Sequence, residues 1–367
     1  KKHLGEIAFK YMGIKPLTQT KKGQDQFDMD MLEELSKTYE WAENLRIYNK
    51  LVKIKSTYID RFLDGQEDGK YYFYFKQNGT VSGRYGSDAQ QLPKPKEQGE
   101  DAPIIVHYNN MVRAFLTAGP GRKIVDADYE SLEPHCFASV TGDTALQEIF
   151  NNGWDFYSTV AIKTEKLDQD TKRFPNGVSP DKKAPNYLKN LDAPARNRAK
   201  PYSLGIAYGM EAYALGMTLG IPQKEAEKLV EGYLNGFPQL KEWRVNSRNQ
   251  IKTHGYIINK VGRIRHLPKV KQIFDKYGDQ LMDWKFRKEL EQRYGKEAVT
   301  QMYRDYRNGL NNCLNYQLQS LAAAVVNRAA VNINRKLKEL GIDGRVQAQV
   351  HDQLIINVPE DKAISSR

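Results

Sequence analysis

The sequence predicts an α+β fold, in which a small sheet is combined with many helices. Helical and strand-like patterns are mixed along the chain without the strand–helix–strand alternation of a parallel sheet. In 346–358 the apolar residues recur at every second position, which is typical of a half-buried strand or hairpin. A second strand-like run lies at 124–129, and helical periodicity dominates 193–254 and 312–340.

The first part of the chain is expected to begin with helices and to continue into strands and loops. Residues 1–65 are predicted to be mostly helical, and 71–75 is predicted to be an aromatic strand. Gly, Ser, Gln and Pro in 79–95 indicate a loop, and 103–150 is predicted to hold a strand and then a helix.

The rest of the chain is dominated by expected helices. Three prolines and many polar residues mark 165–192 as a connector, and 256–259 is predicted to be a strand running into a basic turn. The many charges of 270–308 indicate solvated helices, and the long helix at 312–340 is expected to end at Gly341.

The composition describes a globular chain with a basic balance. The 367 residues carry a formal net charge of +11, with 40% hydrophobic and 28% charged residues, so a large core in two or three subdomains is expected. The excess of Lys and Arg favours a polyanionic partner, with nucleic acid first; an enzyme that merely happens to be basic is the alternative.

The two cysteines and the hydropathy of the chain indicate the cellular compartment. Cys136 and Cys313 are far apart and give neither metal-ligand spacing nor a disulfide framework, which indicates a reducing compartment. No apolar run approaches the roughly 20 residues that span a bilayer, and no signal peptide is visible. We therefore expect a cytoplasmic protein without a membrane partner. The start at Lys1 suggests a fragment of a longer protein.

Two acids in strand-like settings are the first candidate site residues. Asp352 interrupts the apolar alternation of 346–358, and Asp128 lies at the end of the run 124–129. A carboxylate in such a pattern is costly to bury unless a cation or hydrogen bonds stabilise it. If the fold brings Asp128 and Asp352 together, they can hold divalent metal ions. The alternative is that each is an ordinary strand-end or turn residue.

A basic helix is the second candidate element. Arg196, Lys200, Leu204 and Tyr208 are each four residues apart and so line one face of a helix. Two cations one turn apart can hold a triphosphate, and the aromatic ring can stack on a base. The alternative is a solvated basic face. The sequence contains no glycine-rich phosphate-binding loop, so any nucleotide must be held by side chains.

Together these motifs resemble family A DNA polymerases, the family of bacterial DNA polymerase I and many phage replicases. Residues 128–133 resemble the motif Asp-Tyr-Ser-x-Ile-Glu, 196–209 resemble Arg-x-x-x-Lys-x-x-x-Phe-Gly-x-x-Tyr-Gly, and 350–353 resemble Val-His-Asp-Glu. Further segments that resemble the family's motifs occur in the expected order at 55–58, 80–84, 262–268 and 315–319. The resemblance covers nearly the whole chain and is that of a polymerase domain alone, as in a phage or divergent member.

The resemblance implies a right-hand polymerase fold with a thumb, a palm built on an antiparallel sheet, and helical fingers. We expect the thumb at 1–71, the first part of the palm at 72–134, the fingers at 135–308 and the second part of the palm at 309–367. The charged stretch 270–308 looks like an insertion within the fingers.

The implied function is template-directed DNA synthesis, in which a primer 3′-hydroxyl is extended with deoxynucleoside triphosphates. Asp128 and Asp352, with the backbone carbonyl of Ala127 or Tyr129, would hold two Mg²⁺ ions, with Mn²⁺ as a substitute. Arg196 and Lys200 would bind the triphosphate, and Lys200 would protonate the leaving pyrophosphate. Primer–template DNA and dNTPs are therefore the expected partners; a processivity factor or helicase is left unspecified.

Other residues acquire roles from the same resemblance. Glu133 resembles a steric gate that leaves no room for a 2′-hydroxyl, Leu204 lies where the family packs on the nucleotide sugar, and Tyr208 resembles a residue near the templating base; a Glu that only faces solvent is the alternative for Glu133. The remaining residues resemble contacts to primer–template DNA, and they are Arg84, Arg263, Arg265, Asn315, Gln319 and His351. We expect contacts to the minor groove or the primer end from Arg84, Asn315, Gln319 and His351. We expect contacts to backbone phosphates from Arg263 and Arg265.

The chain also departs from the pattern. Leu204 replaces an aromatic residue, Pro201 lies inside the expected fingers helix, Gln353 replaces a Glu, and Asn311 replaces an Arg. Two alternatives for the function remain: a single-subunit RNA polymerase, which Glu133 disfavours, and a catalytically silent nucleic-acid clamp on the same scaffold.

Overall fold

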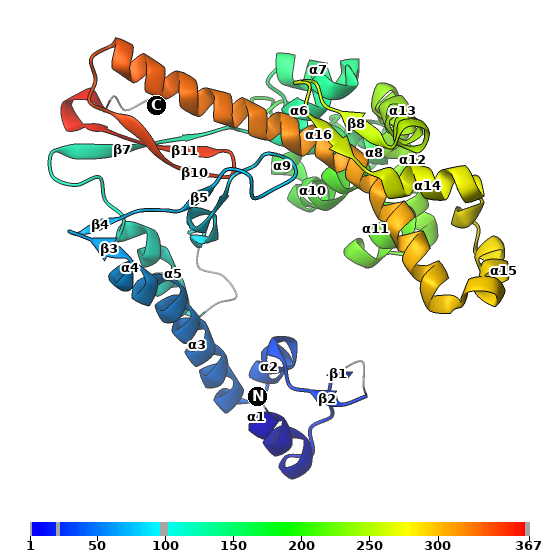
Figure 1. Cartoon of the computed structure of the whole chain (residues 1–367), viewed down its shortest axis with the longest axis horizontal. Helices are drawn as coiled ribbons and strands as arrows, with labels where there is room; N and C mark the ends of the chain where they lie inside the picture. Colours follow the sequence, from blue (N-terminus) through cyan, green and yellow to red (C-terminus); the bar gives the residue numbers. More distant parts are fainter. Residues whose placement is uncertain (1, 20–22, 96–101, 364–367) are drawn as a thin grey trace.

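The computed structural model describes residues 2–19, 23–95 and 102–363. Within these ranges it combines many helices with small sheets whose strands are all antiparallel, which confirms the predicted α+β class. Neighbouring strands in these sheets never require a parallel crossover, so the helices are free to gather into a separate lobe (Figure 1).

The sheet that positions the candidate site has three strands in the order β10-β11-β7. These are β7 (Arg122–Asp128), β10 (Arg345–Val350) and β11 (Gln353–Pro359). The register runs from Gln353 opposite Asp128 to Pro359 opposite Arg122. Side chains alternate between the two faces of a strand. Leu354 is buried on the face that packs against the helices, and Gln353 faces the other way. The predicted strands at 346–358 are present as a hairpin, but burial does not alternate throughout, because Gln349 and Asn357 are also buried and a bulge lies between Val346 and Ala348.

A single helix joins this sheet to the helical lobe. Helix α16 (Lys296–Glu339) has 44 residues, and at 1.5 Å per residue it is about 66 Å long. In Figure 1 it crosses the molecule from the helical lobe to the sheet, and it packs against both β10 and β11. The helix begins earlier than the predicted start at residue 312, because Val299 and Tyr306 supply buried anchors in its charged first half. The predicted 308/309 segment boundary lies inside it.

The helical lobe lies between β7 and α16 in the chain. Two of its helices begin at Asp side chains that cap them: the Asp143 carboxylate accepts from the Leu146 N–H at 3.1 Å, and Asp192 accepts from the Ala195 N–H at 3.0 Å. The helices up to the hairpin are α6 (Leu132–Thr141), α7 (Thr144–Asn151), α8 (Phe156–Glu165), η4 (Leu167–Gln169), α9 (Leu188–Leu191), α10 (Ala193–Ala207), α11 (Ala212–Leu219), α12 (Gln223–Gly236) and α13 (Pro238–His254).

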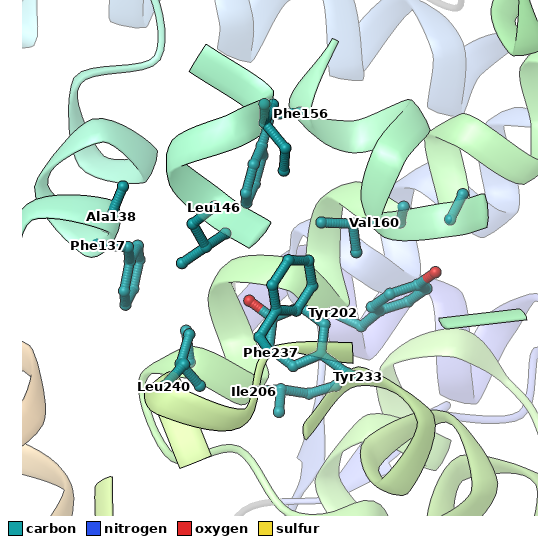
Figure 2. Close-up of a cluster of buried hydrophobic side chains, with 14 of the residues drawn as sticks. Phe137, Ala138, Leu146, Phe156, Val160, Tyr202, Ile206, Tyr233, Phe237 and Leu240 are labelled. Carbon is teal, nitrogen blue, oxygen red and sulfur yellow. The ribbon is translucent and has the colours of Figure 1, made fainter. Parts of the chain in front are cut away.

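The core of this lobe is built from aromatic and aliphatic side chains of several helices. Figure 2 shows Phe137 of α6, Val160 of α8, Tyr202 of α10 and Tyr233 of α12 among the labelled side chains of one cluster. Each of these side chains is almost completely excluded from water, and burial of a side chain of this size contributes about 1.5–3 kcal/mol. The core therefore fixes α10, the helix that carries the predicted triphosphate-binding residues.

A second core supports the charged stretch 270–308. The hairpin of β8 (Tyr256–Ile258) and β9 (Ile264–His266) is followed by α14 (Pro268–Tyr277), η5 (Gly278–Met282) and α15 (Trp284–Tyr294). These elements bury Ile257, Val270, Leu281 and Leu290 against the first half of α16. The stretch is thus a packed unit with a charged outer surface.

The N-terminal part forms an arm with a small core of its own. Its elements are α1 (Lys2–Glu6), η1 (Ile7–Tyr11), β1 (Thr18–Gln19), β2 (Asp25–Gln26), α2 (Met29–Ser36), α3 (Glu40–Ile54), η2 (Lys55–Ile59) and α4 (Asp60–Asp64). Phe27, Met31 and Leu32 are buried between these helices. In Figure 1 the arm extends away from both the sheet and the helical lobe.

The segment between the arm and β7 differs from the sequence-based expectation. In place of one aromatic strand at 71–75, the structure has only the two-residue strands β3 (Gln66–Glu67), β4 (Lys70–Tyr71), β5 (Phe75–Lys76) and β6 (Gly86–Ser87), followed by η3 (Asp88–Gln91) and α5 (Pro103–Ala114). Tyr72 and Tyr74 are 66% and 69% exposed, so no core face holds this run in a longer ladder. Helix α5, before β7, was also not predicted. The last element within the described residues is η6 (Glu360–Lys362).

Among the described residues, no helix combines the length and the apolar character needed to cross a membrane.

Candidate active site

The fold brings Asp128 and Asp352 to the same end of the three-stranded sheet. Asp128 is the last residue of β7, and Gln353, the residue after Asp352, is its cross-strand partner on β11. His351 and Asp352 form the turn between β10 and β11, and His351 has the left-handed φ of +59° that a tight turn requires. Two acids more than 220 residues apart in sequence are therefore neighbours.

The electrostatics of Asp128 reflect this proximity. Asp128 is exposed, yet partial desolvation of its carboxyl is the largest influence and raises its pKa above the ordinary value, and the carboxylates of Asp352 and Asp126 raise it further. Like charges held this close favour a cation between them. Hard carboxylate oxygens are the donors that Mg²⁺ prefers, so Asp128 and Asp352 fit the metal ions expected from the sequence. Within 2–19, 23–95 and 102–363, no three His, Cys, Asp or Glu side chains form a ready-made metal cluster.

Glu133 is held by two hydrogen bonds from distant parts of the chain. The Arg84 Nη2 donates to Glu133 Oε1 at 2.7 Å, and the Tyr208 hydroxyl donates to Oε2 at 2.8 Å. Burial, followed by the charge of Glu133, raises the pKa of Tyr208, which keeps the hydroxyl protonated as a donor. Three predicted site residues thus form one network, and Glu133 does not merely face solvent as the alternative reading required.

Helix α10 carries the four predicted nucleotide-binding residues Arg196, Lys200, Leu204 and Tyr208, which differ in exposure and in their hydrogen bonds. Lys200 is exposed, whereas Leu204 and Tyr208 are half-buried against the core of the helical lobe. The guanidinium of Arg196 is bound to Asp155, with Nε at 2.5 Å from Oδ2 and Nη2 at 3.0 Å from Oδ1. Pro201 lies inside this helix, which continues through it to Ala207.

Asp155 is a site residue that sequence reasoning missed. Besides Arg196, it accepts hydrogen bonds from the Ser158 hydroxyl at 2.6 Å and the Tyr187 hydroxyl at 2.9 Å. Burial alone would raise the pKa of Asp155, but these hydrogen bonds outweigh burial and leave the pKa below its ordinary value. The sequence shows only that Asp155 lies directly before α8. Nothing in the sequence indicates that its side chain binds Arg196, which is 41 residues away.

The remaining predicted residues lie on three elements. Asn315 and Gln319 lie one turn apart on α16, and the buried amide oxygen of Asn315 has no hydrogen-bond partner within the described structure. Arg265, on β9, stacks over the Tyr316 ring with its guanidinium carbon 5.7 Å from the centroid. His351 is exposed at the tip of the β10–β11 turn.

Arg263 is exposed and lies against the loop that carries Arg84. A Cβ built on Gly83, which has a φ of +79°, would come within 1.7 Å of Arg263 Nη1. The absence of a side chain at Gly83 therefore allows the Arg263 guanidinium to lie against the backbone next to Arg84. This proximity is consistent with one basic surface formed by segments that are distant in sequence.

Comparison with known proteins identifies the class to which this architecture belongs. The chain is similar to a solved structure described as "POL domain of Pol1 from M. smegmatis complex with DNA primer-template and dNTP", with a TM-score of 0.70, 25% identity, and coverage of 98% of this chain and 54% of that one. The antiparallel sheet, the helical lobe and the arm therefore have the right-hand α+β fold of a polymerase domain, as predicted.

The family follows from the sequence comparisons. The model for "DNA polymerase family A" matches residues 1–366, and this chain belongs to that family. Among the curated relatives, a thermostable DNA polymerase I of Thermus filiformis is 27% identical over 363 residues, covering 98% of this chain and 37% of that protein. DNA polymerase I of Chloroflexus aurantiacus is 27% identical over 365 residues, covering 98% and 33%. The chain thus spans about a third of the length of these relatives.

Proposed function

We propose that this chain is a template-directed DNA polymerase that extends a primer 3′-hydroxyl with deoxynucleoside triphosphates. The observation that carries the proposal is the convergence of Asp128, at the end of β7, and Asp352, in the adjoining β10–β11 turn. The relatives named DNA polymerase I, and the neighbour described with primer-template and dNTP, support the same reaction and the same partners. The segments 1–71 as thumb, 72–134 and 309–367 as palm, and 135–308 as fingers belong to this proposal.

Asp128 and Asp352 are proposed to hold two Mg²⁺ ions, with the backbone carbonyl of Tyr129 as a further ligand. Bound Mg²⁺ would lower the pKa of the primer hydroxyl and neutralise charge on the departing pyrophosphate. Because a phosphoryl-transfer transition state needs positioning and charge neutralisation more than covalent chemistry, the protein contributes mainly by holding its charges in place.

Helix α10 is proposed to bind the incoming nucleotide. Arg196, held by Asp155, presents the remaining edge of its guanidinium to the phosphates, and exposed Lys200 supplies a second charge one turn away and a proton for pyrophosphate. Leu204 would pack on the sugar and Tyr208 near the templating base.

Glu133 is proposed to exclude ribonucleotides. A carboxylate fixed by both Arg84 and Tyr208 cannot move aside without losing two charge-assisted hydrogen bonds, so it presents a rigid barrier to a 2′-hydroxyl. This rigidity favours a DNA polymerase over an RNA polymerase.

The primer–template is proposed to contact the residues that surround the sheet. Arg84, Asn315, Gln319 and His351 would touch the minor groove or the primer end, and Arg263 and Arg265 would touch phosphates. The unpartnered amide oxygen of Asn315 supports a role in hydrogen bonding to a ligand. Phosphate contacts predict that binding weakens as the salt concentration rises.

Primer extension by the chain and by Asp352→Ala tests the proposal. The parent should extend a primed template with dNTPs and Mg²⁺, extend it far less with ribonucleotides, and lose extension on removal of the Asp352 carboxylate. Extension by neither protein would favour a silent nucleic-acid clamp, and equal use of ribonucleotides would favour an RNA polymerase. Circular dichroism and DNA binding of the variant are the controls for its folding.

A further inference from the structure

A third acid lies on the same face of the sheet as Asp128, one of the two proposed metal ligands. Asp126 and Asp128 are two residues apart on β7, so their side chains leave the same face. Gln353 lies directly opposite Asp128 and therefore also on this face. Both Asp126 and Asp128 are exposed, in contrast to the buried face of the sheet.

Gln353 and Asp126 are joined across the two strands. The Gln353 Nε2 donates to Asp126 Oδ2 at 2.6 Å, a short hydrogen bond to a charged acceptor. A carboxylate accepts but cannot donate when ionised, so the amide nitrogen must face Asp126 and the amide oxygen faces away from it. The hydrogen bond therefore fixes both the position of the Gln353 side chain and the direction of its oxygen.

Fold stability gives a weak reason for an acid at position 126. β7 and β11 are already joined by a continuous antiparallel ladder from Gln353 to Pro359, and a single exposed side-chain hydrogen bond adds little to it. A carboxylate at position 126 instead adds negative charge beside Asp128 and near Asp352 of the adjoining turn, and like charges on neighbouring positions are unfavourable. Cations bound at this face would offset that cost.

Position 353 carries an uncharged side chain where the motif has an acid. The motif that 350–353 resembles ends in Glu, whereas this chain has the uncharged amide of Gln353. The acid of Asp126, one cross-strand diagonal away, restores the negative charge that the motif would have had, and the amide is bound to it.

We infer that Asp126 and Gln353 act as one positioning pair for the proposed metal site, in which Asp126 supplies a third negative charge and Gln353 keeps it in place. Neither residue is a metal ligand: Asp126 acts over a distance on cations held by Asp128 and Asp352. The inference rests on the proposed function of that site. Asp126, which lies outside the motif at 128–133, would therefore help to attract divalent cations to the site.

A charge exchange between the two positions tests the pair. The readout is Mn²⁺ binding to the protein without DNA or nucleotide, followed by electron paramagnetic resonance of free Mn²⁺ at low ionic strength. Asp126→Asn should weaken binding about sevenfold, the effect in water of one charge on a divalent ion roughly 7 Å away. Gln353→Glu in the Asp126→Asn background restores the charge and should recover most of the affinity. Asp361→Asn, an exposed acid beyond the far end of β11, is the matched control and should change nothing.

A second variant separates charge from position. Gln353→Ala keeps the Asp126 charge and removes the hydrogen bond, so it should raise the Mg²⁺ concentration for half-maximal primer extension about twofold and leave the rate at saturating Mg²⁺ unchanged. Parental Mn²⁺ affinity in Asp126→Asn, or no recovery in the double variant, overturns the pair. Failure of the parent chain to extend primers would instead refute the proposed function, so the two failures are distinguishable.

Discussion

Replacement of Asp155 by Asn is the sharpest test of how Arg196 is held. The substitution keeps the shape of the side chain, removes its charge, and leaves Arg196 with a neutral partner. The Asp155 side chain is 6% exposed and that of Arg196 is 16% exposed, so the pair is largely shielded from water. Removal of one partner from a buried pair costs about 3–5 kcal/mol, because it leaves an uncompensated charge.

The expected free-energy cost of Asp155→Asn is somewhat smaller than this, for three structural reasons. Arg196 keeps some contact with solvent and lies over the Tyr157 ring with its guanidinium carbon 5.5 Å from the centroid, and Asn retains one oxygen that accepts a hydrogen bond. The hydrogen bonds from Ser158 and Tyr187 are weakened when their acceptor becomes neutral. We therefore expect the variant to lose about 2–4 kcal/mol of unfolding free energy for the helical lobe.

The loss should depend on pH with a definite sign. The pKa of Asp155 is lower in the folded protein than in an unfolded chain, so its stabilising effect is fully present above the unfolded value of about 3.9 and disappears as the pH falls through the folded value. The difference between parent and Asp155→Asn should therefore be constant from about pH 5 to 8 and should shrink below about pH 4.

The assay is urea denaturation followed by circular dichroism at several pH values, together with the KM for dNTP in primer extension. A freed guanidinium should raise the KM for dNTP by about tenfold with a smaller change in kcat, since misplaced binding groups act mainly on substrate binding. Asp168→Asn, an exposed acid in η4, is the matched control. A loss below about 1 kcal/mol, or an unchanged KM, would refute the view that Asp155 stabilises and orients Arg196.

Three further substitutions have expected outcomes. In Gly309→Ala the new Cβ would come within 2.2 Å of the Val270 side chain, so urea denaturation should show a loss of about 1–3 kcal/mol that Val270→Ala partly restores; a stable single variant contradicts this packing. Gly83→Ala places a side chain at a φ of +79° and against Arg263. Primer–template affinity in a binding titration should therefore fall, while the melting temperature of the helical lobe stays near the parental value. Unchanged affinity argues against Arg263 as a DNA contact. Glu133→Ala removes the barrier fixed on two sides and should raise ribonucleotide incorporation relative to dNTP by at least about tenfold in extension assays, and an unchanged ratio would eliminate it as the gate.

Sequence patterns predicted the parts of this protein that depend on local periodicity or on a motif. The alternation around Asp352 predicted the hairpin, and the four-residue spacing from Arg196 predicted the helix that carries it. The aromatic run 71–75 was predicted wrongly as a strand, because a strand needs a partner and a buried face and this run has neither over its full length. Local pattern alone does not report whether a partner exists.

The partners of the site residues could not be predicted for a related reason. Asp155 meets Arg196, and Arg84 meets Glu133, only after helices and loops far apart in sequence have packed. Asp126 had a signal, its two-residue spacing from Asp128, but the amide that binds it lies 227 residues away. Packing of the whole domain, rather than any local preference, creates these contacts.

The unbroken length of α16 constrains how the protein moves. One end of this helix is fixed in the second core by Val299 and Tyr306, and the other packs on β10 and β11. A continuous helix resists bending, so its two ends act as the ends of a stiff strut. Helix α6 packs directly on α16, and Leu318 and Leu321 of α16 belong to the core of the helical lobe. The sheet and the helical lobe are thus attached to one stiff element, and a closure of α10 around a nucleotide would have to repack contacts of the helical core rather than bend α16.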